Sequence, residues 1–378
     1  MELDEIRKNI DTVDSELLKL FAKRMELCEE VARYKAQNGM EIFQSGREQQ
    51  VLDRIAERSP EKLESASMLL FSQIMEISKF LQKDRLTEPM QVETRGFAAD
   101  PFVACPGIKG SYSEEACLKA FGREARIGYY DTFEQVFEAV NSGEARYGVV
   151  PIENSTAGSV DDTYSLLEHY DMFICGRLHI SVNHVFAAKS EGKITKIISH
   201  PQALRQCSEF IGKEGFAAAR VANTSIAART VSELSEEGIG CICSSHCAEL
   251  YGLKVLKENI ADSSENFTRF IVISKEPEIA ENADIISVCL SLPHISGSLY
   301  KLLTSFYFTG LNLTKIESRH MPPHIKRKSG ADSFEVIFYL DFEGSVLNPS
   351  VGKLLKNLEK DCGYYRFLGN YMEIGGQG

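Results

Sequence analysis

The sequence has no excess of positive charge, because 42 lysines and arginines face 54 aspartates and glutamates, for a formal net charge of -12. This balance argues against a nucleic-acid partner or an anionic membrane surface, although a local basic pocket could still bind a small anion. The sequence also lacks an apolar run of membrane-spanning length. Residues 1–5 are acidic and lead into a helical pattern, so no export signal is expected. These absences favour a cytoplasmic protein.

Metal-ligand spacing is missing as well. The ten cysteines are scattered through apolar segments, which is typical of reduced, buried thiols. Cys241, Cys243, His246 and Cys247 suggest a metal cluster, but the first two lie in an apolar run and no second ligand pair with zinc spacing follows. The glycine spacing of a dinucleotide fingerprint or a phosphate loop is absent too. The sequence therefore predicts neither a metal nor a cofactor.

Residues 2–36 show one continuous helical period. The apolar positions at helical spacing are Ile6, Ile10, Val13, Leu17, Leu20, Leu27 and Val31. A helix of about 35 residues is long for a globular domain and needs a packing partner along its whole length. Two further helices are predicted at about 47–57 and 61–82, with Ser59-Pro60 at the break.

Basic residues interrupt the apolar side of the first predicted helix. Arg24 and Lys35 differ by about 20° in azimuth and lie roughly 16 Å apart, so both side chains can bend toward one small anion. Arg7 lies about 25 Å from Arg24 on a different face. Arg7 is therefore either a solvated surface arginine or part of a site built mainly by a second copy of the chain.

The polar positions of this region resemble, as a set, the all-helical chorismate mutase family. The matching residues within about 1–84 are Arg7, Arg24, Lys35, Arg47, Glu48, Ser78 and Gln82. That family forms an interlaced helical dimer and rearranges chorismate to prephenate. The resemblance implies that Arg7 of the partner chain and Arg24 hold the two substrate carboxylates.

The same resemblance assigns the remaining mutase roles. Glu48 would accept a hydrogen bond from the ring hydroxyl, and Gln44, where the family can place an acid, would lie near that hydroxyl. Lys35 and Gln82 would donate to the ether oxygen, where negative charge grows as the C–O bond breaks. The step would need no nucleophile and no cofactor.

Residues 85–100 are polar, without a clear period, and are typical of a linker. From Pro101 to about residue 275, short apolar runs alternate with helical patterns, which predicts an α/β domain of one or two lobes. The candidate strands are 102–105, 126–129, 147–152, 184–187, 196–199, 220–222, 240–243 and 268–274. Four hydroxyl-rich turns, at 110–113, 153–159, 199–200 and 223–224, indicate a cleft built for an anion.

Three stretches of this region, 150–155, 199–207 and 266–270, resemble the signature stretches of the prephenate dehydratase family and occur in the same order. That family expels the ring hydroxyl of prephenate and a carboxylate as carbon dioxide, and leaves phenylpyruvate. The resemblance assigns Thr268 to the departing hydroxyl. The other residues that it places around the substrate are Glu153, Asn154, Ser155, Ser199, Gln206 and Arg269. His200 is interpreted as structural, since it immediately precedes the helix-starting Pro201.

Residues 284–372 predict a third module with the βαββαβ order of a ferredoxin-like fold. Its expected elements are 284–292, 296–306, 311–317, 333–342, 349–360 and 364–369. Two stretches, 297–299 and 315–319, resemble the effector motifs of the regulatory ACT domain, which binds L-phenylalanine at a dimer interface. The residues implied in effector binding are Gly297, Ser298, Leu299, Glu317, Ser318 and Arg319. Ser298 stands where alanine is common and His320 where the family has proline.

The sequence thus predicts a multidomain chain: an all-α, three-helix, intertwined-dimer domain at 1–84, a two-lobed α/β domain at 101–275 and a ferredoxin-like domain at 284–372. The resemblances imply successive chorismate and prephenate chemistry, feedback inhibition by L-phenylalanine, and a homodimer or higher homo-oligomer. Two alternatives remain open at this point. The helices could serve only as a dimer clamp, and the lobes could bind a solute without turnover.

Overall fold

The computed structural model describes residues 2–40, 45–235, 238–263, 265–321, 325 and 336–375. The chain divides into two compact units. The first comprises Met1–Val92, Leu290–Phe338 and Val346–Arg366, and the second Glu93–Cys289, Tyr339–Ser345 and Phe367–Gly378. Among the described helices, none combines the length and apolarity needed to cross a membrane. The domain limits expected from the sequence stay a prediction.

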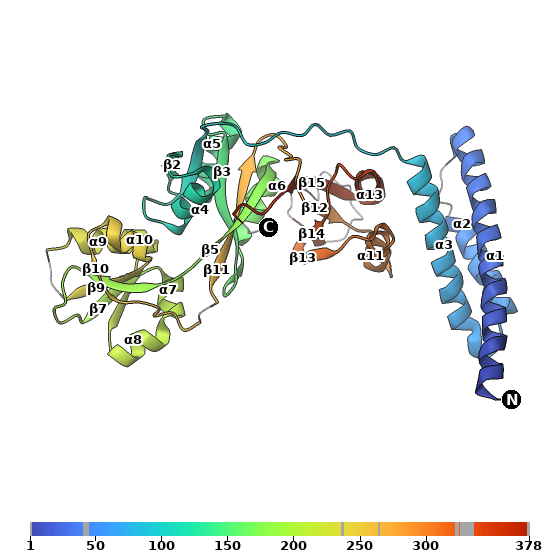
Figure 1. Cartoon of the computed structure of the whole chain (residues 1–378), viewed down its shortest axis with the longest axis horizontal. Helices are drawn as coiled ribbons and strands as arrows, with labels where there is room; N and C mark the ends of the chain where they lie inside the picture. The colour runs from blue at the N-terminus through green and yellow to red at the C-terminus, as the bar shows by residue number, and fades with distance from the viewer. Residues whose placement is uncertain are drawn as a thin grey trace. The chain divides into compact units, whose positions relative to one another are not determined.

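The N-terminal region is helical, as the apolar period predicts. Its elements are α1 (Leu3–Gln37), α2 (Ser45–Arg58), the short 3-10 helix η1 (Glu61–Leu63) and α3 (Glu64–Leu86) (Figure 1). The buried residues of α1 are Met25 and Ala32. By contrast, Ile10, Leu17 and Leu20 of the predicted apolar stripe are 53%, 55% and 66% exposed. A single copy of the chain therefore leaves the long apolar face of α1 in water.

The α/β region contains two sheets, one in each of two lobes (Figure 1). The first sheet has the order β2-β1-β3-β11-β5, with β4 paired to β3. Its strands are β1 (Phe102–Pro106), β2 (Arg126–Tyr130), β3 (Tyr147–Asn154), β4 (Gly158–Ser159), β5 (Phe173–Ser181) and β11 (Phe267–Ser274). Its helices are α4 (Tyr112–Phe121), α5 (Phe133–Ser142) and α6 (Asp161–Tyr170).

The second lobe is the chain between β5 and β11. Its sheet has the order β10-β6-β9-β7-β8. The strands are β6 (Val185–Ala188), β7 (Lys196–Ser199), β8 (Ala217–Arg220), β9 (Ile239–Cys243) and β10 (Lys254–Lys257). The helices are α7 (Pro201–Gln206), α8 (Ser208–Glu214), α9 (Thr224–Glu233) and α10 (Ser245–Leu250). Because the chain returns to the first sheet only with β11, the second lobe is an insertion between two neighbouring strands.

Some strand predictions for this region are wrong. The predicted strand at 220–222 lies instead at Ala217–Arg220, where three successive alanines carry little strand preference. Strands β5 and β10 were not predicted. In β5 the apolar residues Ile174, Leu178 and Ile180 lie at alternate positions, but Gly176 occupies the position between the first two and shortens the recognisable pattern.

Strand β11 has two antiparallel neighbours, β3 and β5. Thr268 pairs with Asn154 of β3 and with Ile180 of β5, and Arg269 pairs with Glu153 and His179. Successive side chains of a strand point to opposite faces of the sheet. Thr268 and Asn154 therefore share one face, while Arg269, Glu153 and His179 share the other.

The C-terminal module has the predicted βαββαβ order. Its elements are β12 (Ile285–Ser291), α11 (Ser298–Thr309), β13 (Leu313–His320), β14 (Val336–Glu343), α13 (Pro349–Asp361) and β15 (Tyr364–Tyr371). The strand order β13-β14-β12-β15 is that of a ferredoxin-like sheet. The part of the predicted strand at 333–335 lies outside the described residues.

A buried carboxylate follows the first sheet. The side chain of Glu278 is 1% exposed, forms an ion pair with Arg146 and accepts a hydrogen bond from the Tyr147 hydroxyl at 2.5 Å. The Tyr147 oxygen in turn accepts from the Ala98 amide at 2.8 Å. Burial and the hydrogen bond to Glu278 raise the pKa of Tyr147 to about 12. Glu278 thus ties the segment after β11 to β3 and to the segment before β1.

We expect the Glu278→Ala substitution to lower the free energy of unfolding by about 3 kcal/mol, because it leaves Arg146 and Tyr147 without their buried partner. The measurement is urea-induced unfolding followed by circular dichroism. The matched control is Glu276→Ala, since Glu276 is 65% exposed and 3.8 Å from Arg95. That change should cost at most about 0.5 kcal/mol. Equal effects of the two substitutions would contradict the stabilising role of Glu278.

Candidate active sites

Asn154, at the end of β3, is the centre of a hydrogen-bond network between β3 and β11. Its Nδ2 atom donates to Thr268 Oγ1 at 3.0 Å, to Asn266 Oδ1 at 3.1 Å and to the Phe267 carbonyl at 3.1 Å. Its Oδ1 atom accepts from the Thr156 hydroxyl at 2.7 Å. The amide of Asn154 therefore fixes both the strand end that carries Thr268 and the turn that follows β3.

Two side-chain amides on helix α7 of the second lobe join this network. Gln202 Nε2 donates to Asn154 Oδ1 at 3.0 Å, and Gln206 Nε2 donates to Thr156 Oγ1 at 2.5 Å. The helix begins at Pro201, and His200 caps it by accepting the Gln202 amide on Nδ1 at 3.2 Å. The structural interpretation of His200 is thus confirmed. The two lobes meet at a polar surface built from Thr268, Asn154 and α7.

Thr268 is half-buried and its hydroxyl is oriented by Asn154. Because Nδ2 of Asn154 donates to Oγ1, one lone pair of the hydroxyl is occupied, and Thr268 can donate its own hydrogen. Asn266, two residues earlier on the same face, is 5% exposed. Its Nδ2 atom has no hydrogen-bond partner among the described residues. A buried donor of this kind beside an oriented hydroxyl is suited to bind an oxygen of a ligand.

His184 is connected to the same network through a hydrogen bond with Gln206. Its Nε2 atom lies 3.0 Å from Gln206 Oε1 and its Nδ1 atom 3.3 Å from the Tyr112 hydroxyl. Burial lowers the pKa of His184, the hydrogen bond to Gln206 opposes this, and the nearby His200 lowers it further. His184 is therefore neutral at neutral pH, and its Nε2–H donates to Gln206. It orients Gln206 and carries no charge to the site.

Two predicted substrate contacts lie on the opposite face of the sheet from Thr268. Arg269 Nη1 donates to Glu153 Oε2 at 2.6 Å, and Arg269 Nε donates to His179 Nε2 at 3.1 Å. The strand register places this group behind the Thr268–Asn154 pair. The expectation that Glu153 and Arg269 line the same surface as Thr268 is therefore corrected, because adjacent residues of a strand face opposite ways.

Ser199 is a second correction. It is 0% exposed, and its hydroxyl donates to the Ile242 carbonyl at 2.7 Å, so it joins the ends of β7 and β9 rather than facing a ligand. Ser155 is exposed and links two segments, since its hydroxyl donates to the Glu265 carbonyl at 3.2 Å and accepts the Phe267 amide at 3.1 Å.

The sequence analysis gave no role to three residues that complete this network: Thr156, His184 and Gln202. Gln202 lies within residues 199–207, which resemble a signature stretch of the dehydratase family, and it directly follows Pro201. Its position in the first turn of a predicted helix was therefore the available sign that Gln202 could reach the site. His184 gave no local signal, because its partner Gln206 lies on the separate helix α7.

The predicted mutase residues lie on all three N-terminal helices. Ser78 and Gln82 of α3 are buried, and Gln82 Nε2 donates to Ser78 Oγ at 2.9 Å. Glu48 of α2 pairs at 3.2 Å with Lys79 of α3. On α1, Arg24 and Lys35 are half-buried. The structure therefore brings Glu48 close to the helix that carries Ser78 and Gln82.

Two other mutase positions, Arg7 and Arg47, are not brought to that group, and a third cannot be placed. The Arg7 side chain is 66% exposed and lies 3.5 Å from Asp4 on its own helix. Arg47 is exposed and donates to Gln50 at 3.4 Å. Gln44 lies outside the described residues. By helical rise, Arg7 and Lys35 are about 42 Å apart along α1, so one copy cannot place both at one small ligand.

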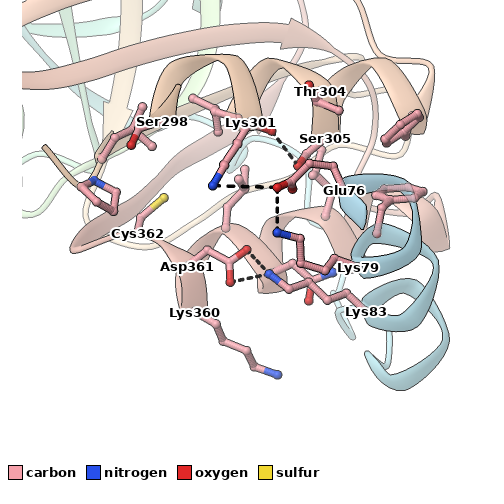
Figure 2. Close-up of a pocket in the computed structure, with 18 of the residues that line it drawn as sticks. Glu76, Lys79, Lys83, Ser298, Lys301, Thr304, Ser305, Lys360, Asp361 and Cys362 are labelled. Carbon is pink, nitrogen blue, oxygen red and sulfur yellow. Dashed lines mark hydrogen bonds and ion pairs between the residues drawn. The ribbon is translucent and has the colours of Figure 1, made fainter. Parts of the chain in front are cut away.

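A cavity of about 410 Å³ lies between α3, α11 and α13 (Figure 2). Figure 2 shows Glu76 between Lys79, at 2.7 Å, and Lys301, at 3.8 Å, while Lys83 points to Asp361. The apolar part of the lining includes Phe80, Leu302, Phe308, Leu354 and Leu358. Of the six predicted effector residues, Ser298 lines this cavity. The remaining five are not among its lining residues.

Those five lie at the start of α11 and on β13. Gly297 precedes α11 with a left-handed φ of 84°, and Leu299 is 38% exposed in the first turn. On β13, Glu317 pairs with Arg319 at 2.9 Å and with Lys315 at 3.0 Å, whereas Ser318 is exposed on the other face. The binding of an effector by these residues stays a prediction.

Comparison with known proteins agrees with this arrangement. The prephenate dehydratase family matches residues 103–278, and the chorismate mutase type II family matches residues 6–83. The bifunctional chorismate mutase/prephenate dehydratase of Aquifex aeolicus is 31% identical over 377 residues, which cover 98% of each chain. The chloroplastic arogenate dehydratase/prephenate dehydratase 1 of Arabidopsis thaliana is 36% identical over 281 residues, 71% of each chain.

Among solved structures, the prephenate dehydratase of Arthrobacter aurescens in complex with L-Phe matches with a TM-score of 0.65 at 26% identity. The match covers 73% of this chain and 91% of that one. A helical region that matches the mutase family, followed by a two-lobed α/β region that matches the dehydratase family, thus defines an enzyme of the mutase–dehydratase class. The chain belongs to the family of bifunctional chorismate mutase/prephenate dehydratases.

Because Ser199 is buried, we expect its substitution to lower the stability of the protein rather than its catalytic rate. We expect Ser199→Ala to lower the free energy of unfolding by about 1–2 kcal/mol, because the Ile242 carbonyl loses its hydrogen bond. Turnover of prephenate should stay within about 3-fold of the parent enzyme. The two measurements are urea unfolding and formation of phenylpyruvate. A large loss of turnover with unchanged stability would show that Ser199 contacts the substrate.

Proposed function

We propose that the residues described above carry two consecutive reactions in defined roles. The chain rearranges chorismate to prephenate in its N-terminal helices and converts prephenate to phenylpyruvate in its α/β region, and L-phenylalanine inhibits it. The observation that carries the dehydratase assignment is the contact between Asn154 and Thr268, at 3.0 Å across two neighbouring strands. It presents a neutral, oriented hydroxyl at the junction of two lobes.

The mutase step is supported by polar groups that are already oriented. The bond from Gln82 Nε2 to Ser78 uses one of the two hydrogens on that nitrogen, and the other can donate to the ether oxygen of chorismate. Lys79 holds the carboxylate of Glu48, which would accept from the ring hydroxyl. Lys35 would add a positive charge at the breaking C–O bond. These fixed donors stabilise the charge that develops in the transition state.

A second copy of the chain would complete this site. The apolar stripe of α1 is exposed in one copy, with Leu17 and Leu20 at 55% and 66%, so an interlaced dimer would bury it. The same arrangement would bring Arg7 of the partner to the site that contains Arg24. Arg7 and Arg24 would then bind the two carboxylates of chorismate.

A complementation experiment tests this sharing. Neither Arg7→Ala nor Arg24→Ala homodimers should retain mutase activity above about 1% of the parent, because each loses one carboxylate contact. Random exchange of the two variants should restore about a quarter of the sites, since half of the dimers are mixed and each has one intact site. Mutase activity before and after subunit exchange is the measurement. No recovery in verified mixed dimers would argue against a shared site.

The dehydratase step would take place on the Thr268 face of β11. Thr268 would pass its hydroxyl proton to the ring hydroxyl of prephenate as the C–O bond breaks, so that this hydroxyl leaves as water, and solvent would return a proton to Thr268. The bond to the ring carboxylate breaks at the same time, its electron pair enters the ring, and carbon dioxide departs. Aromatisation supplies the driving force, so a neutral hydroxyl in a preorganised site is sufficient. The buried Nδ2 of Asn266 would bind an oxygen of the substrate.

Thr268→Val removes the hydroxyl and keeps the shape of the side chain. We expect kcat for phenylpyruvate formation to fall by roughly 100-fold or more, in line with the loss of one proton donor. Thr268→Ser, which keeps the hydroxyl, should retain at least about a tenth of the parent activity. Mutase activity of the same preparations serves as the control for folding. Undiminished prephenate turnover by the valine variant would remove Thr268 from the mechanism.

The C-terminal module would act as a regulatory ACT domain. The Arthrobacter aurescens relative was solved with L-Phe, and the sheet order here is ferredoxin-like. Gly297, Ser298 and Leu299 at the start of α11 would bind the effector with Glu317, Ser318 and Arg319 of β13. Effector binding and substrate binding would then weaken each other by the same factor.

A further inference from the structure

The segment after β15 is attached to β5 of the dehydratase sheet. The Arg177 amide donates to the Met372 carbonyl at 3.2 Å, and the Ile374 amide donates to the Arg177 carbonyl at 2.7 Å. Glu373 and Arg177 form a parallel β-bridge. The contact is close, because a Cβ atom on Gly176 would lie 2.6 Å from the Ile374 side chain. The C-terminal segment thus adds one more short strand to the edge of this sheet.

Glu373 holds two side chains of β5. One carboxylate oxygen accepts from Arg177 Nε at 2.7 Å, and the other is bonded to His179 Nδ1. His179 Nε2 accepts from Arg269 Nε at 3.1 Å, so the ring hydrogen must be on Nδ1 and is donated to Glu373. Arg269 in turn donates to Glu153 at 2.6 Å. Glu373 therefore selects the tautomer of His179 that can accept from Arg269.

These four side chains form a row across the sheet. Glu153 belongs to β3, Arg269 to β11 and His179 to β5, and the strand register pairs Arg269 with both of the others. The next residues along the first two strands are Asn154 and Thr268, which point to the opposite face and bond to each other. The row consequently lies directly behind the catalytic hydroxyl. It fixes the spacing of the two strand ends that carry that hydroxyl and its partner.

The charge state of Glu373 fits this role. Burial would raise the pKa of Glu373, but the hydrogen bonds from His179 and Arg177 outweigh it and lower the pKa to about 2. This low pKa keeps the carboxylate ionised at neutral pH. The side chain is 27% exposed, so it is largely shielded from water. Loss of its charge would release Arg177 and both tautomers of His179 would become accessible.

We propose that Glu373 is a positioning residue of the dehydratase reaction: through His179 and Arg269 it holds β3, β5 and β11 so that Asn154 and Thr268 stay in bonding register. This proposal rests on the proposed role of Thr268. Small displacements of reacting groups cost large factors in rate, so the effect is expected in kcat rather than in substrate affinity.

The test uses the full-length enzyme and its two activities. We expect Glu373→Gln to lower kcat for prephenate turnover about 10-fold, with KM within about 3-fold of the parent. Mutase activity of the same preparation should stay within about 2-fold. His179→Asn breaks the next link and should lower kcat by a similar factor, and the double variant should be no slower than the slower single variant. The exposed Glu281 provides the matched control, as Glu281→Gln should change neither activity.

A spectroscopic measurement separates this role from a purely structural one. In protein labelled with nitrogen-15 in histidine, the side-chain signal that disappears in His179→Asn should show a protonated Nδ1 in the parent and lose that signature in Glu373→Gln. An unchanged kcat, multiplicative effects of the two substitutions, or an unchanged His179 signal would overturn the proposal. Failure of the parent to convert prephenate would instead refute the dehydratase assignment itself.

Discussion

The return of the chain to the first sheet as β11 is the constraint on which the dehydratase site depends. Thr268 and Asn154 are far apart in sequence, and the pairing of β11 with β3 alone brings their side chains within 3.0 Å. The inserted second lobe begins and ends at neighbouring strands, so α7 reaches the same point from the other side. The site is therefore a product of topology, and any change that shifts the register of β11 by one residue would turn Thr268 away.

The sequence was sufficient for much of the fold and for the strand that carries Thr268. The helix α1 was predictable because its apolar residues repeat over about seven turns without a breaker. The strand that carries Thr268 was predictable because an apolar run follows its motif. The period-2 alternation of that motif also places Asn266 on the same face as Thr268, as the structure shows. Arg269 and Glu153 belong to the quoted stretches, yet alternation directs both to the far side of the sheet.

Other parts of the site could not be predicted because their partners are distant in sequence. The hydroxyl of Ser199 could have faced a ligand or the backbone, and only the pairing of β7 with β9 shows that Ile242 accepts from it. Strand β5 carries Arg177 and His179, which weaken its apolar pattern. These two residues are compatible with a largely buried sheet edge because Glu373, far along the chain, pairs with the charge of Arg177 and accepts the Nδ1 hydrogen of His179.

The two candidate active sites share one physical feature, which is a neutral polar group oriented by an internal hydrogen bond. In each candidate site, an internal hydrogen bond engages one hydrogen or lone pair of a neutral polar group and leaves the remaining hydrogen available to a ligand. Ser78 does this for Gln82, and Asn154 does it for Thr268. Catalysis by such weak groups depends on orientation more than on acidity.

Orientation in turn depends on the elements that hold the backbone. In the dehydratase sheet, the row from Glu153 to Glu373 supplies that rigidity from behind, and its last member follows β15 of the ferredoxin-like sheet. The last two residues of β15 contact β12. Asn370 donates to the Ile285 carbonyl at 3.0 Å, and the Tyr371 hydroxyl lies 2.6 Å from the Ser287 hydroxyl. The end of β15 is thus bonded to both sheets. A shift of β15 against β12 would displace Glu373, so the ferredoxin-like sheet and the strands that carry Asn154 and Thr268 are physically connected through a few consecutive residues.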